Sequence, residues 1–319
     1  MPAGCFIVST GRCGSTLLSD LLREHPALLS LSELFSSLRS TRMPAFPPGD
    51  LAGADTWRLL TTPRPEVNLL LMQRCADTGA QVARGLSPGR VPPLLMGPLP
   101  GLSPDPLALH EELGAFVRGL PAAPAAKQYT RAFEWLCGRL DRGDWVERSA
   151  GSAAYADELV RGWPEARYVH LVRDGRATAR SMSANDGFRM AALLEELGDR
   201  AATPAGLVGA IASLRTAWIP IERFGDLWSS QVIAADRWLR ALPGERRLTL
   251  RYEDLVGDAA GELRRLASFL GLEGAATECW VREAAARVAR PRTDWRELPD
   301  EERGRLEAAC APGLALLGY

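Results

Sequence analysis

The sequence predicts an α/β fold with three layers, α/β/α, in which helices cover both faces of a central parallel sheet. Short apolar segments with the character of buried strands recur along the chain, and each is followed by a segment with helical spacing of its apolar residues. Strands that alternate with helices form parallel sheets with right-handed crossovers. With 319 residues, 46% of them apolar, the chain is long enough to form this fold as one domain over 1–319.

The predicted elements follow one another in five units. A strand over 5–9 leads through a loop to a helix over 15–26, which Pro26 closes, and a second strand over 27–32 ends next to Glu33. Three more strand-and-helix units are predicted at 144–149 with 153–163, at 166–174 with 175–184, and at 246–255 with 259–272.

Two segments interrupt this alternation. Residues from about 39 to 143 contain proline-rich stretches among amphipathic helical patches, and residues 185–242 look mainly helical. We expect both to be insertions above the carboxyl ends of the strands, where open α/β sheets bind ligands. The proline-rich stretches are interpreted as lids or as long surface loops. Several tryptophans either line a ligand pocket or pack in the core: Trp57, Trp135, Trp218, Trp228 and Trp238.

Composition excludes several classes of partner. A formal net charge of -1 and a pI of about 6.4 provide no overall field that attracts nucleic acid or an anionic membrane. No segment approaches the ~20 consecutive apolar residues of a membrane span. The six cysteines form no CxxC pair and no secretory signal precedes Cys5, so we expect a reduced, cytoplasmic protein. The three histidines lack metal-ligand spacing, and no metal is predicted.

The stretch STGRCGST joins the first strand to the first helix. Gly11 and Gly14 remove side chains where the backbone turns tightly, so that backbone amides can approach an anion. The start of the helix adds unpaired amides and the positive end of its dipole. Ser15 and Thr16 can add hydroxyl donors, and Arg12 a cation. This stretch is therefore predicted to bind a phosphate, the alternative being an ordinary turn with Ser15 as the helix N-cap.

The stretch lacks a residue that ATP and GTP sites usually have, and this limits which phosphate ligand it could bind. No lysine precedes the serine and threonine as in the Walker pattern GxxxxGK[ST], so an ATP or GTP site is disfavoured. A second basic unit, YVHLVRDGRATARSMSA, places Arg173 at the end of a strand and Ser181 about two helical turns later. Arg173 is expected at the same edge of the sheet, so the two units could hold two separate phosphates. The alternative is a surface pair between Arg173 and Asp174.

Three motifs together resemble those of the sulfotransferases that use 3′-phosphoadenosine 5′-phosphosulfate (PAPS). STGRCGSTLLSDLL resembles their 5′-phosphosulfate loop, commonly PRSGST or PKSGTT, and LVRDGRATARSMS resembles their 3′-phosphate segment, commonly RDPRAVAxS. LRYEDLVGDAAGELRRLASFLGL is similar to the later YEDL-to-FLGL stretch of the family. The motifs occur in the family order and at family-like distances, which makes the combination more specific than any one of them.

The resemblance implies a P-loop-like sulfotransferase fold and an enzyme that transfers a sulfuryl group from PAPS to a hydroxyl group. The acceptor would be a small molecule, a lipid or a carbohydrate, and 3′-phosphoadenosine 5′-phosphate (PAP) would be released. The two insertions would form the acceptor side. The resemblance predicts that no metal is bound. It makes no prediction of the oligomeric state. The cofactor-binding residues that it implies are Gly11, Arg12, Cys13, Gly14, Ser15, Thr16, Arg173, Ser181, Tyr252, Arg290, Arg292 and Trp295.

The sequence departs from the family pattern at three of these motif positions. Gly11 replaces the usual proline, Cys13 the usual serine, and Gly175 the proline of the second motif. The two glycines are plausible backbone substitutions. Cys13 removes a hydroxyl, and it is interpreted either as a weakened ligand or as a packed thiol.

Three residues are the candidates for catalysis, Glu33, Arg12 and Arg148, and a fourth is an alternative to Glu33 as the base. Glu33 resembles the glutamate that acts as a base in part of the family, while the alternatives are that it caps the next helix or pairs with an arginine. His25 is the other candidate base, at the distal end of the first helix. Arg12 would stabilise charge on the leaving phosphate. Arg148, in WVERSAGS, would contact the sulfonate or the acceptor, whereas Glu147 is expected in a structural pair.

The remaining candidates lie near the end of the chain. RPRTDWRELP resembles the late loop that closes over the nucleotide, and it supplies Arg290 and Arg292 for phosphate and Trp295 for adenine, unless Trp295 packs in the core. Tyr252 is expected to be structural rather than catalytic. Two other functions stay open: a P-loop kinase or phosphotransferase, and a nucleotide-binding protein without catalysis.

Overall fold

The computed structural model of the chain describes residues 4–39, 44–63, 90–198, 203–214, 216–289 and 294–319. Five parallel strands form its main sheet in the order β2-β5-β1-β6-β7. Their bounds are Cys5–Val8 for β1, Leu28–Ser32 for β2, Asp144–Arg148 for β5, Arg167–Val172 for β6 and Arg247–Arg251 for β7. The predicted α/β class and parallel sheet are confirmed.

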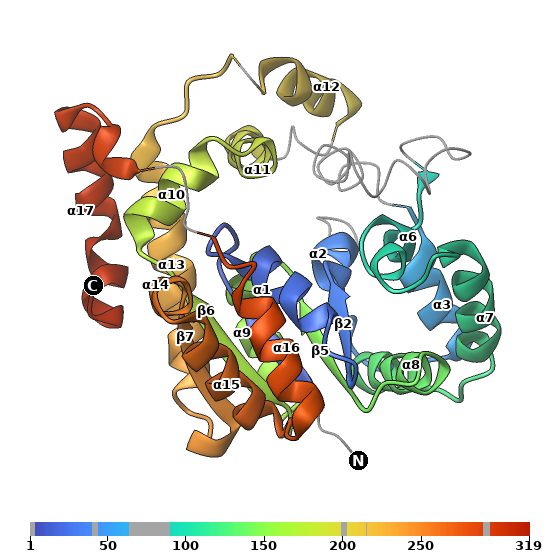
Figure 1. Cartoon of the computed structure of the whole chain (residues 1–319). Helices are drawn as coiled ribbons and strands as arrows, with labels where there is room; N and C mark the ends of the chain where they lie inside the picture. The colour runs from blue at the N-terminus through green and yellow to red at the C-terminus, as the bar shows by residue number, and fades with distance from the viewer. Residues whose placement is uncertain (1–3, 40–43, 64–89, 199–202, 215, 290–293) are drawn as a thin grey trace.

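Helices cover both faces of this sheet, and Figure 1 shows the three layers. One face carries α1 (Ser15–Arg23), α15 (Ala259–Leu270) and α16 (Ala275–Ala285), and the other carries α8 (Ala125–Arg139), α9 (Ala156–Gly162) and α13 (Ile221–Leu239). Strand residues alternate between the two faces, as a strand period of two requires. In β1, Phe6 and Val8 pack towards α8 and α9, whereas Cys5 and Ile7 pack towards α1.

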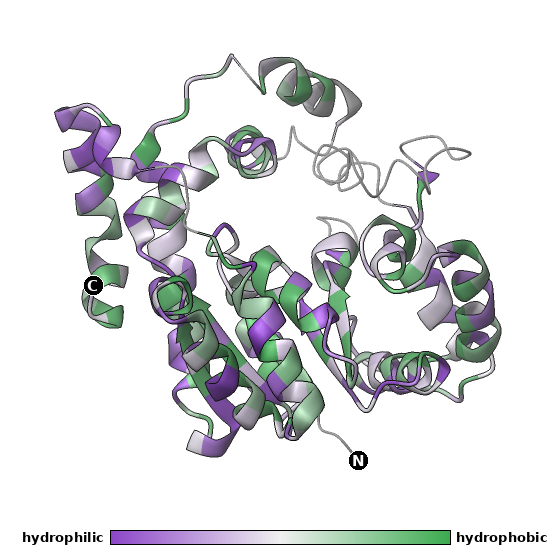
Figure 2. Ribbon diagram, viewed as in Figure 1, coloured by the Kyte–Doolittle hydropathy of each residue, from purple (hydrophilic) through white to green (hydrophobic). Residues whose placement is uncertain are grey.

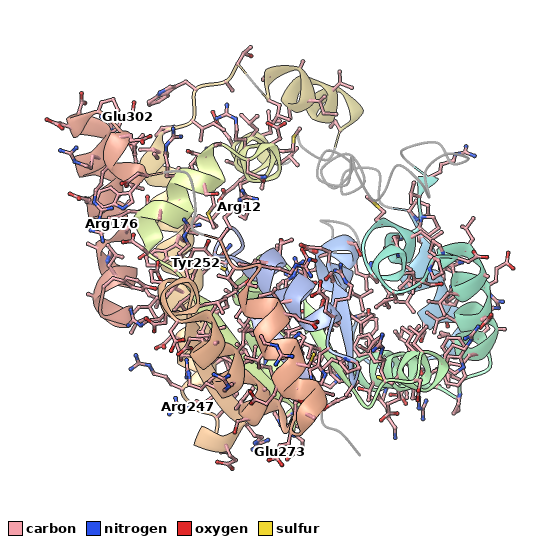
Figure 3. The ribbon with its side chains drawn as sticks, viewed as in Figure 1. Arg12, Arg176, Arg247, Tyr252, Glu273 and Glu302 are labelled. Atoms are coloured by element: carbon pink, nitrogen blue, oxygen red, sulfur yellow. The ribbon has the colours of Figure 1, made fainter. Side chains whose placement is uncertain are left out.

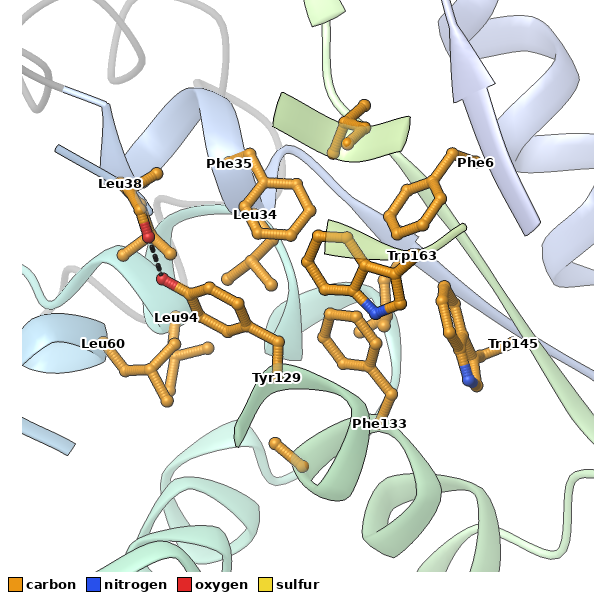
Figure 4. Packing of buried hydrophobic residues seen from close by; sticks show 14 of the residues in the cluster. Phe6, Leu34, Phe35, Leu38, Leu60, Leu94, Tyr129, Phe133, Trp145 and Trp163 are labelled. Carbon is orange, nitrogen blue, oxygen red and sulfur yellow. Dashed lines mark hydrogen bonds between the residues drawn. The ribbon is translucent and has the colours of Figure 1, made fainter. Parts of the chain in front are cut away.

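The larger core cluster is rich in aromatic side chains. The ring of Phe6 lies 5.3 Å from that of Trp145, 4.9 Å from that of Trp163 and 5.6 Å from that of Tyr168. Figure 4 shows this packing around Phe6 and Tyr129, whose hydroxyl donates to the carbonyl oxygen of Ala45 at 2.6 Å. Tilted and edge-on ring pairs of this kind add to the burial of apolar area. The covering helices, such as α8 and α15, carry both hydrophobic and hydrophilic residues (Figure 2).

Two predicted boundaries differ from the structure. The strand predicted over 246–255 ends at Arg251, and Tyr252–Gly257 forms a helix, α14. Tyr252 and Leu255 are both buried, three residues apart, which matches a helix face rather than the alternation of a strand. The first helix ends at Arg23 instead of Pro26, because a residue that precedes proline is disfavoured in the helical conformation.

The predicted insertions contribute helices to the sheet layers as well as to the rim. The first contains a short antiparallel pair, β3 (Asp50–Leu51) with β4 (Ala123–Pro124), and the helices α3 (Gly53–Thr61), α6 (Pro93–Met96), α7 (Pro106–Arg118) and α8. The second contains α11 (Asp186–Leu197), α12 (Pro204–Ser213) and α13. The helices α8 and α13 belong to the core cluster that covers the sheet.

The proline-rich stretch after residue 90 is neither a lid nor a surface loop. It forms α6 and the short 3₁₀ helix Leu99–Gly101, and it buries Val91, Leu94, Leu95 and Leu99 in the larger core cluster. Proline at the first position of a helix lacks only an N–H that would have no helical partner there, so prolines do not prevent this packing. The other described α-helices are α2 (Leu34–Leu38), α10 (Gly175–Ser183) and α17 (Asp300–Leu317), and α17 packs along α13.

Candidate active site

The predicted site residues follow the carboxyl ends of neighbouring strands. In the parallel register Val8 lies opposite His170, and Ser32 lies opposite Arg148. The loops after β1, β2, β5 and β6 therefore start at one edge of the sheet, as the sequence predicts. In Figure 3, Arg12 and Tyr252 lie at this edge, whereas Arg247 and Glu273 lie at the other end of the sheet.

The loop between β1 and α1 has the backbone of an anion-binding turn. Gly11, Arg12 and Gly14 all have positive φ, at 77°, 57° and 92°. Backbone turns of this kind direct successive N–H groups into one concavity, and the start of α1 adds its unpaired amides. Gly14 is also required by packing, because a Cβ atom there would lie 2.3 Å from the Cδ2 atom of Tyr252.

Two arginines and a serine from distant parts of the chain meet at this loop. The Arg12 Nε donates to the Ser181 Oγ at 3.1 Å, and an Arg173 guanidinium nitrogen donates to the Arg12 carbonyl oxygen at 3.1 Å. The Arg173 guanidinium also lies 4.7 Å from the centre of the Tyr252 ring. The structure thus brings together Arg12, Arg173, Ser181 and Tyr252, with Tyr252 as packing support for both the loop and Arg173.

The other side chains of the loop point in different directions. Cys13 is buried in the core cluster beneath α1, and this burial raises the pKa of its thiol. Its position corresponds to the packed-thiol interpretation. Ser15 is buried and Thr16 is exposed. The N-cap of α1 is Gly14, so the alternative with Ser15 as the N-cap is wrong.

Glu33 and Arg148 form a buried ion pair at the ends of β2 and β5. Arg148 donates to the Glu33 Oε1, and the exposed fractions of the two side chains are only 3% and 16%. The Glu33 Oε2 accepts from the Ser36 hydroxyl and, at 3.1 Å, from the backbone N–H of Ala150. Glu33 has φ 61°, a left-handed conformation that is uncommon for a residue other than glycine. The pairing with an arginine that the sequence left open is therefore present.

Glu147 points away from this pair into the core. Its Oε1 accepts from the Ser149 hydroxyl at 2.6 Å, and its Oε2 has no hydrogen-bond partner among the described residues. Burial raises the pKa of Glu147 to about 8, which the hydrogen bond from Ser149 and the charge of Arg148 only partly offset. The structural pair predicted for Glu147 is thus a pair with a serine.

His25 lies beyond the end of α1, too far from the loop to act on the same group as Glu33. Its Nε2 shares a hydrogen bond of 3.1 Å with the Thr277 hydroxyl, and its Nδ1 accepts from the N–H of Ala27 at 3.2 Å. The residue is buried before the amino end of β2, at the opposite edge of the sheet from Glu33. The alternative base is therefore wrong.

Trp295 packs in a core cluster formed with α10, α13 and α17. The guanidinium of Arg176 lies 4.5 Å from its ring centre, and Arg176 also pairs with Asp174. The alternative interpretation of Trp295 as a core residue thus corresponds to its packing. Arg290 and Arg292 lie outside the described residues.

Sequence reasoning missed the residues that support the loops. The Ser152 Oγ accepts from the N–H of Ser9 at 3.0 Å and donates to the Ile7 carbonyl oxygen at 3.1 Å, which anchors the loop after β1. The Phe188 ring would lie 2.8 Å from a Cβ atom at Gly11. A serine just beyond a buried strand was a usable signal for Ser152, but nothing local to Phe188 indicated its contact.

The described residues contain neither a cluster of metal ligands nor a helix that could span a membrane. In the described ranges, no three histidine, cysteine, aspartate or glutamate side chains are grouped as metal ligands. No helix in these ranges has the length and apolar character needed to cross a membrane.

Comparison with known proteins points to one family. The Sulfotransferase family model matches residues 119–276. Carbohydrate sulfotransferase 7 of Mus musculus is 27% identical over an alignment that covers 98% of this chain and 73% of the mouse protein. Carbohydrate sulfotransferase 7 of Rattus norvegicus is 32% identical over 47% of this chain and 34% of the rat protein.

Solved structures share the fold at low sequence identity. The sulfotransferase domain from the curacin biosynthetic pathway superposes with a TM-score of 0.53 at 19% identity, covering 100% of this chain and 98% of that domain. A sulfotransferase from Mycobacterium avium has a TM-score of 0.52 at 16% identity, covering 98% of this chain and 76% of that structure.

Proposed function

The chain belongs to the sulfotransferase family, and from this membership we propose that it transfers a sulfuryl group from PAPS to the hydroxyl group of an acceptor. The chain is therefore a sulfotransferase enzyme. What we propose is which donor and which acceptor it uses. The meeting of Arg12, Arg173 and Ser181 at a glycine-containing loop is the observation that carries it.

The residues present fit a donor with two anionic groups. The loop before α1 combines positive-φ glycines with a helix start, a combination that suits the 5′-phosphosulfate. Arg173 and Ser181 come from the next unit along the sheet, and we assign them to the 3′-phosphate. Arginine suits both positions because its charge does not titrate and its planar donors match phosphate and sulfate oxygens.

PAPS supplies an activated sulfuryl group when it is bound. In the proposed reaction, the acceptor oxygen forms a bond to sulfur while the bond from sulfur to the phosphate oxygen breaks, and the acceptor proton passes to Glu33. The Arg12 guanidinium stabilises the negative charge that develops on the leaving phosphate. Arg148 keeps the Glu33 carboxylate turned towards the carboxyl edge of the sheet.

Glu33 already accepts a hydrogen bond from an alcohol. The Ser36 hydroxyl donates to its Oε2, so this oxygen is accessible to a hydroxyl donor. We propose that the acceptor hydroxyl takes the place of the Ser36 hydroxyl during transfer. A base must come within hydrogen-bond reach of the proton that it removes.

For the acceptor, we propose a carbohydrate hydroxyl as the first class to examine. This choice follows the printed names of the mouse and rat relatives, which are carbohydrate sulfotransferases. Small hydroxylated metabolites and lipids are the other two classes. They are separated by a transfer assay that offers each class in turn with the same donor.

The donor is tested by thermal unfolding of the full chain with PAP, AMP, ATP plus Mg²⁺, or no ligand. A ligand at about 100 times its Kd stabilises the folded state by about 2.7 kcal/mol, which raises the Tm of a chain of this length by about 4 °C. We expect this rise with PAP only. Arg173→Ala and Ser181→Ala should reduce it, and Arg264→Ala, which removes an exposed arginine of α15 far from the loop, should not.

A rise with ATP and Mg²⁺ alone would overturn the proposal and move the chain to the phosphotransferases. A rise with PAP without any sulfuryl transfer to the three acceptor classes would favour a nucleotide-binding protein without catalysis. Loss of the PAP effect in Arg264→Ala would show that the shift reports general charge instead of the assigned site.

A further inference from the structure

The hydroxyl of Ser149 has every hydrogen-bonding position filled. It accepts from the backbone N–H of Phe35 at 2.9 Å and from that of Ser36 at 3.2 Å. A serine hydroxyl has one proton to donate, and both contacts with N–H groups use its lone pairs. The remaining proton is therefore directed to the Glu147 Oε1, 2.6 Å away.

These contacts make Ser149 the cap of α2. The first amides of a helix lack helical partners, and the N-cap residue usually supplies a side-chain acceptor. Glu33 is the N-cap of α2, yet its side chain makes no capping bond. Since Ser149, directly after β5, satisfies those amides, the Glu33 carboxylate is turned to Arg148 and to the candidate site instead.

The turn at Glu33 needs this support. A left-handed backbone at a residue other than glycine is strained and persists only where the surroundings hold it. Besides the Ser149 contacts, the Glu33 N–H donates to the Arg148 carbonyl oxygen at 2.7 Å. The segment after β5 thus fixes both the backbone of Glu33 and the start of its helix.

Glu147 fixes the orientation of Ser149. The two residues lie two apart on β5 and its extension, so their side chains leave the same side of the strand, while Arg148 leaves the other side. Both Glu147 and Ser149 are completely buried. Within the described ranges Ser149 is the hydrogen-bond partner of Glu147, so this carboxyl group serves the serine and not an ion pair.

We propose that Glu147 and Ser149 are positioning residues, which orient the turn that carries Glu33. They act through that turn and do not contact the donor or the acceptor. This inference rests on the proposed function, in which Glu33 is the base. It adds that the reaction depends on a buried carboxyl and hydroxyl pair behind the base.

The first test is kinetic and uses Ser149→Ala and Glu147→Leu in the full chain. Each change should lower kcat by about 10- to 100-fold, a smaller loss than that of the base itself, with little change in the affinity for PAP. Glu147→Gln keeps an oxygen acceptor for Ser149 and should retain kcat within about threefold. The matched control is Ser37→Ala, because Ser37 is buried in the same helix but donates to the Leu34 carbonyl oxygen.

A double-mutant cycle separates positioning from general stability. In a Glu33→Gln background, Ser149→Ala should cause no further loss of kcat, since the group that it positions no longer acts. A full additional loss in that background, or an equal loss of PAP affinity in Ser149→Ala alone, would overturn the proposal. Full activity of both Ser149→Ala and Glu147→Leu would overturn it too.

Amide hydrogen exchange gives a readout that does not need activity. The amides of Phe35 and Ser36 should exchange faster in Ser149→Ala than in the unmodified chain, with other segments unchanged, and Glu147→Leu offers the same measurement if Ser149→Ala does not fold. Unchanged exchange at these two amides would overturn the positioning role. Faster exchange at these two amides in Ser149→Ala, together with no transfer from PAPS by the unmodified chain, would instead contradict the proposed function alone.

Discussion

At the scale of single residues, Glu33 combines a strained backbone with a carboxylate held by three donors. Arg148, Ser36 and the Ala150 amide fix the direction of its two oxygens. In the proposed reaction, a base held in this way loses little entropy when the acceptor hydroxyl arrives. These three contacts do not involve Arg12 or Arg173, which lie on other loops. We therefore expect a change at Glu33 to affect catalysis and to leave donor binding intact.

Glu33→Gln should therefore lower kcat by about 10²- to 10⁴-fold, the usual contribution of a positioned base. The affinity for PAP, measured by thermal shift, should stay within about twofold. Steady-state kinetics with PAPS and a responsive acceptor checks the first expectation. The matched control is Glu158→Gln, since Glu158 also pairs with an arginine, Arg39, but on α9. A Glu33→Gln enzyme with normal kcat would remove Glu33 from the reaction.

At the scale of elements, packing and backbone conformation both constrain the junction between β1 and α1. Gly14 has φ 92° and stands against Tyr252, which in turn lies under the Arg173 guanidinium. A side chain at Gly14 must push Tyr252 aside, so the change would reach Arg173 on the neighbouring unit. One turn thereby couples the two groups that we propose bind the phosphates of the donor.

Gly14→Ala should reduce PAP affinity by about tenfold or more and should also lower the Tm. A left-handed alanine and the displaced ring each oppose the loop conformation, and 1.4 kcal/mol corresponds to a factor of ten. Isothermal titration with PAP measures the first effect. Gly138→Ala is the control, because Gly138 lies in α8 with open space around it. Equal effects of the two substitutions would contradict this account.

Elements were predictable where the pattern is local. The five strands and the helices that follow them stand close to their predicted positions, because strand and helix periods are written in neighbouring residues. The helix at Tyr252 was missed because RYEDL continues an apolar strand without a breaker residue. The packing of the segment after residue 90 was missed because prolines, read locally, favour loops.

At the scale of the whole molecule, two buried titratable groups make folding stability depend on pH in opposite directions. Burial raises the pKa of Glu147 from 4.5 to about 8 and lowers that of His170 from 6.5 to about 4. Between pH 4.5 and 8 the folded chain keeps a proton on Glu147 that the unfolded chain has lost, so rising pH lowers the free energy of unfolding. Between pH 4 and 6.5 the unfolded chain holds an extra proton on His170, so rising pH raises it.

The two contributions oppose each other up to pH 6.5, and only that of Glu147 acts from there to pH 8. We expect the free energy of unfolding to fall over this upper window by about 1.4 kcal/mol per pH unit. Glu147→Gln should remove this fall, and the exposed control Glu278→Gln should keep it. Urea unfolding at pH 6.5, 7.25 and 8 measures the slope. Parallel slopes for the unmodified chain and Glu147→Gln would contradict the assignment.

The sequence alone determined the order of strands and helices along the chain, and it predicted the anion loop and the second basic unit, because each is a pattern within a few residues. The tertiary structure alone decided that Glu33 pairs with Arg148, that Ser149 caps the helix of Glu33, and that the Cys13 thiol is buried in the core. More than 110 residues separate Glu33 from Arg148, and more than 110 separate Ser149 from the helix that it caps. Such partners meet only because β5 enters the sheet between β1 and β2, and no local pattern encodes the order of strands in a sheet.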